Sequence, residues 1–132
     1  MRFAGYAAVF DRVDGGGDVI RRGAFAESLA RGREIPLLWQ HKAGAVIGRV
    51  ERVEEDQRGL RVIGEIGGDA DALRAAGLLA SGAVNGLSFG YRVGDASRAN
   101  GVRELRALEL VEVSLVAKPM QTLARVHAVE RS

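Results

Sequence analysis

A serine and a histidine that could act together stand in two apolar segments far apart in the sequence. Ser88 lies within residues 84–91, with one glycine two positions before it and another two positions after it. In a strand, glycines at that spacing share the face of the serine, so they leave room for a carbonyl carbon to approach its hydroxyl. His41 ends the apolar segment 37–41 and could accept the hydroxyl proton. Together the two segments predict a serine hydrolase.

A carboxylate is expected to be buried in a third apolar segment. Glu112 lies within residues 110–116, where a charged side chain needs a cation or an imidazole as its partner. It is the candidate that orients the histidine and stabilises its charged form. An ordinary ion pair with an arginine is the alternative. Glu109 lies three residues upstream, so odd spacing predicts the opposite face of the strand, whereas Ser114 shares the face of Glu112.

The composition excludes several other chemistries. The chain has no cysteine, which rules out disulfides, a thiolate nucleophile and a cysteine-based zinc site. The two histidines, His41 and His127, are far apart and form no metal-binding motif, so the sequence predicts neither a metal nor another cofactor. The 19 basic residues are scattered among 17 acidic ones for a net charge of +2, and this mixture argues against nucleic-acid binding.

Length and hydropathy indicate one domain inside a cell. With 132 residues, 47% of them hydrophobic, and no internal linker, residues 1–132 are expected to fold as a single domain. No apolar run approaches the roughly 18 residues that span a membrane. The first residues read as the start of a strand and lack the pattern of a signal peptide, which favours a protein made and used inside a cell.

Patterns along the chain predict about seven strands and two helices. The expected strands are residues 2–10, 18–21, 35–41, 46–54, 60–66, 83–93 and 102–116, the last as one strand or two. The expected helices are residues 23–32 and 69–82, the second with helical apolar spacing behind an aspartate. Residues 42–44 predict a turn, residues 94–101 predict a polar loop, and residues 122–129 fit a strand or a short helix.

The order of these elements indicates the fold class. Strands and helices do not alternate regularly, and no internal repeat is present. We therefore expect a β-rich α+β fold built on a mostly antiparallel seven-stranded β-barrel with flanking helices.

Taken in order, these segments resemble the phage prohead proteases of the HK97 type, which act in capsid maturation. The resemblance covers residues 3–125 and depends on six or more segments in the right order rather than on one decisive motif. The segments are GYAAVF at 5–10, DVIRRGAF at 18–25, LLWQH at 37–41, IG at 47–48, GL at 59–60, GAVNGLSFGY at 82–91 and EVSLV at 112–116, followed by Pro119.

The resemblance implies a fold similar to that of the herpesvirus proteases called assemblins, and it implies a serine endopeptidase. In the family pattern His41 is the general base, Ser88 the nucleophile and Glu112 the third member of the triad. Assemblins have a second histidine as the third member, so His127 and Glu109 remain alternatives for that role.

The resemblance does not assign the residues that form the oxyanion hole. The pair of arginines expected after the third member is absent here, and Lys118 and the backbone near Ala117 are the candidates.

The resemblance also implies substrates, partners and a place of action. The expected substrates are the scaffold, or the scaffolding segment of the major capsid protein, and the protease itself. Cleavage is expected inside the assembling procapsid, in the cytoplasm of a bacterial host. The source is expected to be a phage, a prophage or a gene transfer agent. The active form is expected to be a homodimer or a higher oligomer. Two alternatives stay open: a catalytically silent assembly or scaffolding factor with the same fold, and a small β-barrel binding module.

Overall fold

Eight strands and two helices make up residues 1–130, the part of the chain that this computed structural model describes. The strands are β1 (Arg2–Val9), β2 (Asp18–Ile20), β3 (Pro36–Trp39), β4 (Lys42–Glu55), β5 (Gly59–Ile66), β6 (Gly86–Ala99), β7 (Val102–Val116) and β8 (Val126–Glu130). The helices are α1 (Ala26–Ala30) and α2 (Ala70–Ala80). The segment that fitted either strand or helix therefore forms a strand at its C-terminal end.

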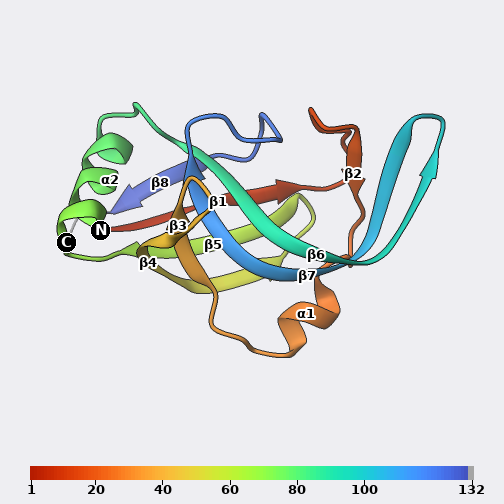
Figure 1. The fold of residues 1–132 in the computed structure, drawn as a ribbon, viewed down its shortest axis with the longest axis horizontal. Helices are drawn as coiled ribbons and strands as arrows, with labels where there is room; N and C mark the ends of the chain where they lie inside the picture. The colour runs from red at the N-terminus through yellow and green to blue at the C-terminus, as the bar shows by residue number, and fades with distance from the viewer. Residues whose placement is uncertain (131–132) are drawn as a thin grey trace.

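The strands form one strongly curved, mixed sheet (Figure 1). Its order is β2-β7-β3-β4-β5-β1-β8, with β6 paired to β7. Strands β2 and β3 run parallel to β7, and the other pairs are antiparallel. The β-rich α+β class is confirmed.

The expected seven-stranded barrel differs from the observed sheet, which has eight strands and is not closed. Between β6 and the segment that leads into β8, the pairing is an isolated bridge from Gly86 to Arg125. A closed barrel needs a continuous ladder between its first and last strands. Here β8 pairs with β1 on one side. On its other side, the single bridge to β6 does not extend into a ladder, so the barrel stays open.

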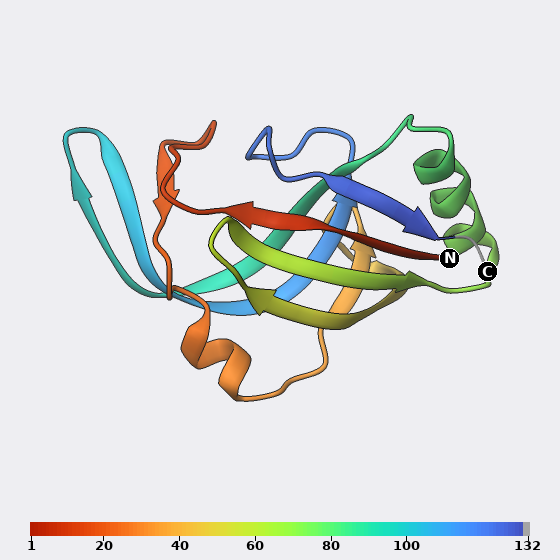
Figure 2. The same cartoon turned by 180° about the vertical axis from the view of Figure 1, so that it is seen from behind.

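Strands β6 and β7 form a long hairpin that projects beyond the rest of the sheet (Figures 1 and 2). The predicted loop at residues 94–101 is wrong, because Ala99 pairs with Val102 across a two-residue turn. The turn residues Asn100 and Gly101 both have positive φ, which is the conformation that Asn-Gly favours in tight hairpins. Residues 92–99 of β6 are almost all exposed, so this half of the projection lacks the apolar alternation that marks a strand.

The two predicted helices are confirmed with shorter bounds. Helix α2 begins at the N-cap Asp69, whose carboxylate accepts a hydrogen bond from the Ala72 N–H at 2.8 Å. Its apolar face is buried against the sheet, and it lies at the end of the molecule away from the tip of the β6–β7 hairpin (Figure 2). Neither helix in residues 1–130 is long and apolar enough to cross a membrane.

The core lies on the concave side of the sheet and reaches beneath the strands that carry the candidate residues. Leu37 of β3, Leu87 of β6, and Val113 and Leu115 of β7 have no exposed surface. These side chains fix the relative positions of three strands, because a shift of register by one residue would move apolar groups out of the core. The opposite side chains of the same strands are therefore held in a defined arrangement.

Candidate active site

Strand β7 is the centre of the candidate site, because the other two contributing segments pair with it. Ser88 of β6 pairs with Ser114 of β7, so their Cα atoms are about 4.5–5.5 Å apart and their side chains share a face. Leu38 of β3 pairs with Ser114 from the other side. Glu112 lies two residues before Ser114 on the same strand. The sheet thus brings together three segments that are far apart in the sequence.

His41 lies in a tight turn rather than at the end of a strand. The predicted turn at residues 42–44 is wrong: β3 connects to β4 through Gln40 and His41, whose φ angles are 53° and 61°. Two consecutive positive φ values suit a two-residue hairpin, but side chains other than glycine and asparagine adopt them at an energetic cost. Such strain persists only where surrounding contacts compensate for it.

Three hydrogen bonds hold this turn against the end of β7. The N–H of Gln40 donates to the carbonyl of Leu115, and the N–H of His41 donates to Ser114 Oγ, both at 3.0 Å. The side-chain oxygen of Gln40 accepts from the N–H of Ala117, also at 3.0 Å. The imidazole is therefore carried by a fixed segment. The bond to Gln40 occupies the N–H of Ala117, a predicted candidate for the oxyanion hole.

The imidazole of His41 contacts the carboxylate of Glu112. His41 Nδ1 lies 2.5 Å from Glu112 Oε1, and the two side chains are 43% and 9% exposed. A carboxylate can only accept, so Nδ1 carries the proton and the neutral ring presents Nε2 as a base. The hydrogen bond to Glu112 raises the pKa of His41, and partial burial opposes that rise.

The second carboxylate oxygen of Glu112 is also occupied. The hydroxyl of Ser114 donates to Glu112 Oε2 at 2.6 Å, while Ser114 Oγ itself accepts from the N–H of His41 at 3.0 Å. Ser114 has no exposed surface. The spacing of two residues along a strand predicts Ser114 on the face of Glu112, but the sequence alone predicts no role for it.

Glycine makes room for the carboxylate on the neighbouring strand. Gly90 pairs with Glu112, and a Cβ built on Gly90 would lie 2.6 Å from Glu112 Oε1. A Cβ on Gly86 would lie 2.6 Å from the carbonyl oxygen of Val116. The two glycines that flank Ser88 therefore accommodate groups of the protein itself, and not the substrate as their spacing predicted.

A β-bulge sets the position of Glu112 along β7. Gly90 pairs with Glu112 but the next residue of β6, Tyr91, pairs with Leu110, so Val111 is an extra residue. Because of this extra residue, Glu109 pairs with Arg92 and lies on the same face of the strand as Glu112. The predicted placement of Glu109 on the opposite face is therefore wrong.

The alternatives for the third member lie apart from His41. Glu109 forms an ion pair with Arg33 at 2.5 Å. His127 packs edge-to-face on Tyr6 of β1, with 5.5 Å between ring centroids. Of the three candidates, Glu112 contacts the imidazole.

Ser88 and His41 line the same cavity, whose volume is about 180 Å³. Among residues 1–130 no hydrogen bond joins the two side chains. Such bonds are often long in a substrate-free enzyme and shorten in the complex. The cavity is lined in part by the apolar side chains of Leu87 and Phe89 and the polar side chains of Asp14 and Tyr91. It is smaller than the ~300–1,000 Å³ of drug-sized ligand sites, so its size suits a single side chain.

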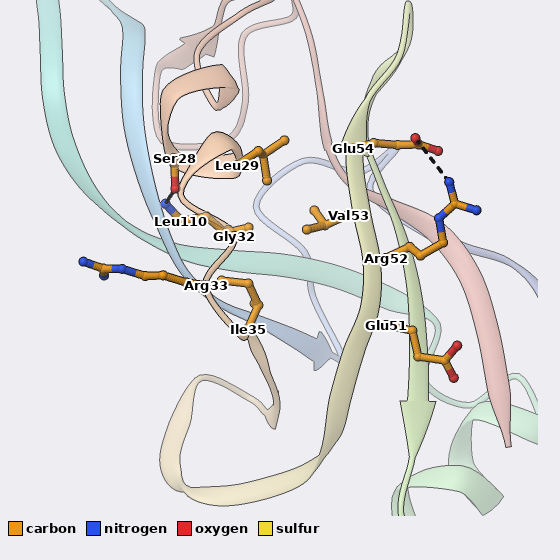
Figure 3. Close-up of a pocket in the computed structure, with 10 residues that line it drawn as sticks. All are labelled: Ser28, Leu29, Gly32, Arg33, Ile35, Glu51, Arg52, Val53, Glu54 and Leu110. Atoms are coloured by element: carbon orange, nitrogen blue, oxygen red, sulfur yellow. Dashed lines mark hydrogen bonds and ion pairs between the residues drawn. The ribbon is translucent and has the colours of Figure 1, made fainter.

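A second cavity, of about 300 Å³, lies between α1 and β4, away from these groups (Figure 3). Its polar side chains already have partners: Ser28 accepts from the Leu110 N–H, and Arg52 pairs with Glu54. It offers no nucleophile next to a base. Within residues 1–130, no three His, Asp or Glu side chains converge as metal ligands would.

Comparison with known proteins gives one family and one curated relative. The family profile of the Caudovirus prohead serine proteases matches residues 1–132. The prohead protease of Enterobacteria phage HK97 is 38% identical over 97 residues, which are 69% of this chain and 42% of that protein. The chain thus spans less than half the length of this relative.

Solved structures of viral proteases share the fold. The varicella-zoster virus protease superposes with a TM-score of 0.63 and 18% identity, over 95% of this chain and 62% of that one. The capsid assembly protease of bacteriophage T4 superposes with a TM-score of 0.76 and 10% identity, over 89% and 82%. At these identities the likeness supports the fold alone, and it confirms the expected similarity to herpesvirus proteases.

Proposed function

This chain belongs to the Caudovirus prohead serine protease family, and we propose that it is a serine endopeptidase of capsid maturation with Ser88, His41 and Glu112 as its catalytic residues. The observation that carries the proposal is the contact of His41 Nδ1 with the Glu112 carboxylate in the wall of the cavity that Ser88 also lines. This contact leaves His41 Nε2 available as a base for the Ser88 hydroxyl.

The reaction is an acyl transfer in two halves. His41 Nε2 takes the proton of the Ser88 hydroxyl while Oγ bonds to the scissile carbonyl carbon. The tetrahedral intermediate collapses with cleavage of the C–N bond, and the imidazolium gives its proton to the leaving amine. Water then attacks the ester with the same base, which releases the acid and restores Ser88. Glu112 stabilises the imidazolium in both halves and keeps the ring in the required tautomer.

The family and its named members support the choice of substrate. We propose the scaffold, or the scaffolding segment of the major capsid protein, and the protease itself as substrates, cleaved inside the assembling procapsid in the bacterial host. A homodimer or higher oligomer is part of the same proposal. The cavity beside Ser88 suits one substrate side chain next to the scissile bond.

Coexpression with the cognate major capsid protein tests the proposal. We expect trimming with the wild type and none with Ser88→Ala. The matched control is Ser97→Ala, which removes an exposed hydroxyl from the same strand β6, where it accepts a hydrogen bond from Arg106. Equal trimming by wild type and Ser88→Ala would refute Ser88 as the nucleophile.

A second function is a catalytically silent assembly factor, which the lack of a direct Ser88–His41 hydrogen bond favours. In that case shells would form only in the presence of the protein, their capsid protein would keep its full length, and Ser88→Ala would assemble them as well as the wild type. Mass spectrometry of the capsid protein separates the two functions.

A further inference from the structure

We propose that Ser114 is a positioning residue of the catalytic site, one that sets the orientation of Glu112 and the conformation of the His41 turn through a single hydroxyl. The proposal rests on the proposed function, since it concerns the same site. Ser114 touches neither a substrate nor the reacting atoms. It acts through the two residues that it joins.

The hydroxyl of Ser114 uses both of its hydrogen-bonding capacities within the site. Its O–H donates to Glu112 Oε2 at 2.6 Å, and its oxygen accepts from the His41 N–H at 3.0 Å. The side chain is fully buried and its proton is engaged by the carboxylate. Ser114 is therefore in no position to attack a carbonyl group, although it is the other serine in an apolar strand.

The bond to Glu112 fixes the orientation of the carboxylate group, with one oxygen toward Ser114 and the other toward the imidazole. Among residues 1–130, the side-chain hydrogen bonds of this carboxylate come from His41 and Ser114, one to each oxygen. A buried carboxylate oxygen without a donor would turn toward another partner. With the Ser114 hydroxyl on Oε2, Oε1 is left in place at 2.5 Å from His41 Nδ1.

The bond to His41 holds the backbone that carries the ring. The turn residues Gln40 and His41 have positive φ, and the contacts to β7 compensate for that strain. Loss of the acceptor would allow the turn to relax, which moves the imidazole relative to Ser88. A displacement of about 1 Å at a catalytic group can reduce a rate about 100-fold.

The chain offers a matched control for the loss of such a hydroxyl. Ser28 Oγ accepts a hydrogen bond from a backbone N–H of the same strand, that of Leu110, at 2.9 Å. Ser28→Ala removes a comparable bond to β7 outside the site, whereas Ser114→Ala removes the bonds to Glu112 and His41. Any general effect of weakening the packing on β7 appears in both variants.

The experiment measures how fast diisopropyl fluorophosphate labels Ser88 in the purified full chain, as a function of pH. In this reaction Oγ bonds to phosphorus, fluoride leaves, and His41 takes the proton, so no protein substrate is needed. We expect Ser114→Ala to label about 10- to 100-fold more slowly than the wild type. In its pH–rate profile, the midpoint, which is the pH at which labelling reaches half its maximum, should fall toward the ordinary histidine pKa, because a misplaced Glu112 no longer raises the pKa of His41. Ser28→Ala should keep the wild-type rate and midpoint.

Two further measurements keep the proposal falsifiable if Ser114→Ala does not fold. Ser114→Cys nearly preserves the volume with a weak donor and acceptor, and we expect the same slower labelling and lowered midpoint. In the unmutated protein, the amide of His41 should exchange its hydrogen slowly, although its side chain is 43% exposed.

The outcomes separate the two proposals. A labelled Ser88 with unchanged rate and midpoint in folded Ser114→Ala overturns the positioning role alone, as does an equal loss of rate in Ser28→Ala. A fast-exchanging His41 amide also overturns it. If wild type and Ser88→Ala trim the capsid protein equally, the proposed function fails and the role of Ser114 fails with it.

Discussion

Glu112→Gln is the sharpest test of the proposed catalytic residues, because it changes one oxygen to nitrogen and nearly preserves the shape. The Ser114 hydroxyl needs an acceptor, so the amide oxygen is expected to take the place of Oε2. The amide NH₂ then faces His41 Nδ1, where the carboxylate oxygen was. Since an NH₂ group donates, Nδ1 must become an acceptor and the imidazole proton moves to Nε2. That nitrogen can no longer take the proton of Ser88.

Two effects contribute to the expected decrease in the reaction rate of Ser88 in Glu112→Gln. A hydrogen bond to a charged group contributes about 1.5–3 kcal/mol, and the lower end applies here because the imidazole is 43% exposed to water. At 1.36 kcal/mol per tenfold, this effect alone reduces the rate about tenfold. The wrong tautomer adds to it, and the same change in a Ser-His-Asp triad reduces kcat by about 10⁴. We therefore expect the rate at which Ser88 reacts in Glu112→Gln to be about 10²- to 10⁴-fold lower than in the wild type.

The pH dependence has a defined sign. The base must be neutral, so activity rises as pH increases through the pKa of His41. Glu112 raises that pKa, which places the midpoint of the wild type above the ordinary histidine value of about 6.5. Without the carboxylate the pKa falls, and the midpoint of Glu112→Gln moves to lower pH while the plateau drops.

The assay is the pH profile of Ser88 labelling by diisopropyl fluorophosphate, with trimming of the capsid protein as a second readout. Glu109→Gln is the matched control, since it neutralises a carboxylate three residues upstream on the same strand that pairs with Arg33. A labelling rate for Glu112→Gln within threefold of the wild type, or an unchanged midpoint, would contradict the role of Glu112 as the partner of His41. A large loss in Glu109→Gln instead would transfer the role to that residue.

Three further perturbations test neighbouring parts of the structure. Gly90→Ala would place a Cβ 2.6 Å from Glu112 Oε1, so labelling of Ser88 should slow by at least about tenfold while the protein stays folded by circular dichroism; an unchanged rate would contradict the space-making role of this glycine. Asp69→Ala removes the N-cap of α2 and should lower the free energy of unfolding in urea by about 1 kcal/mol, with no change in labelling. Arg103→Lys should lower the free energy of unfolding at pH 7, because Arg103 binds both carboxylate oxygens of Asp18 and lowers its pKa. That contribution exists above the ordinary aspartate pKa and disappears as pH falls through the lowered one, so a loss that does not shrink below about pH 4 would argue against the pair as its source.

Much of the architecture could be predicted from local patterns. Alternation over residues 46–54 marked β4, and helical spacing behind Asp69 marked α2, because burial of one face favours those periods. Residues 94–99 of β6 were missed as a strand because exposed strands carry no such period, and the informative signal was the Asn100–Gly101 pair.

The types of residue in apolar surroundings were enough to propose a serine, a histidine and a glutamate for catalysis, since a polar group in such a segment needs a chemical or structural reason. The contacts among them depend on pairing between residues that are far apart: His41 and Glu112 are separated by 71 positions, and His41 and Ser114 by 73. Register between strands sets these contacts. The strained turn, the bulge at Val111 and the bridging hydroxyl therefore followed only from the tertiary structure, because each exists through a neighbour that no local period can specify.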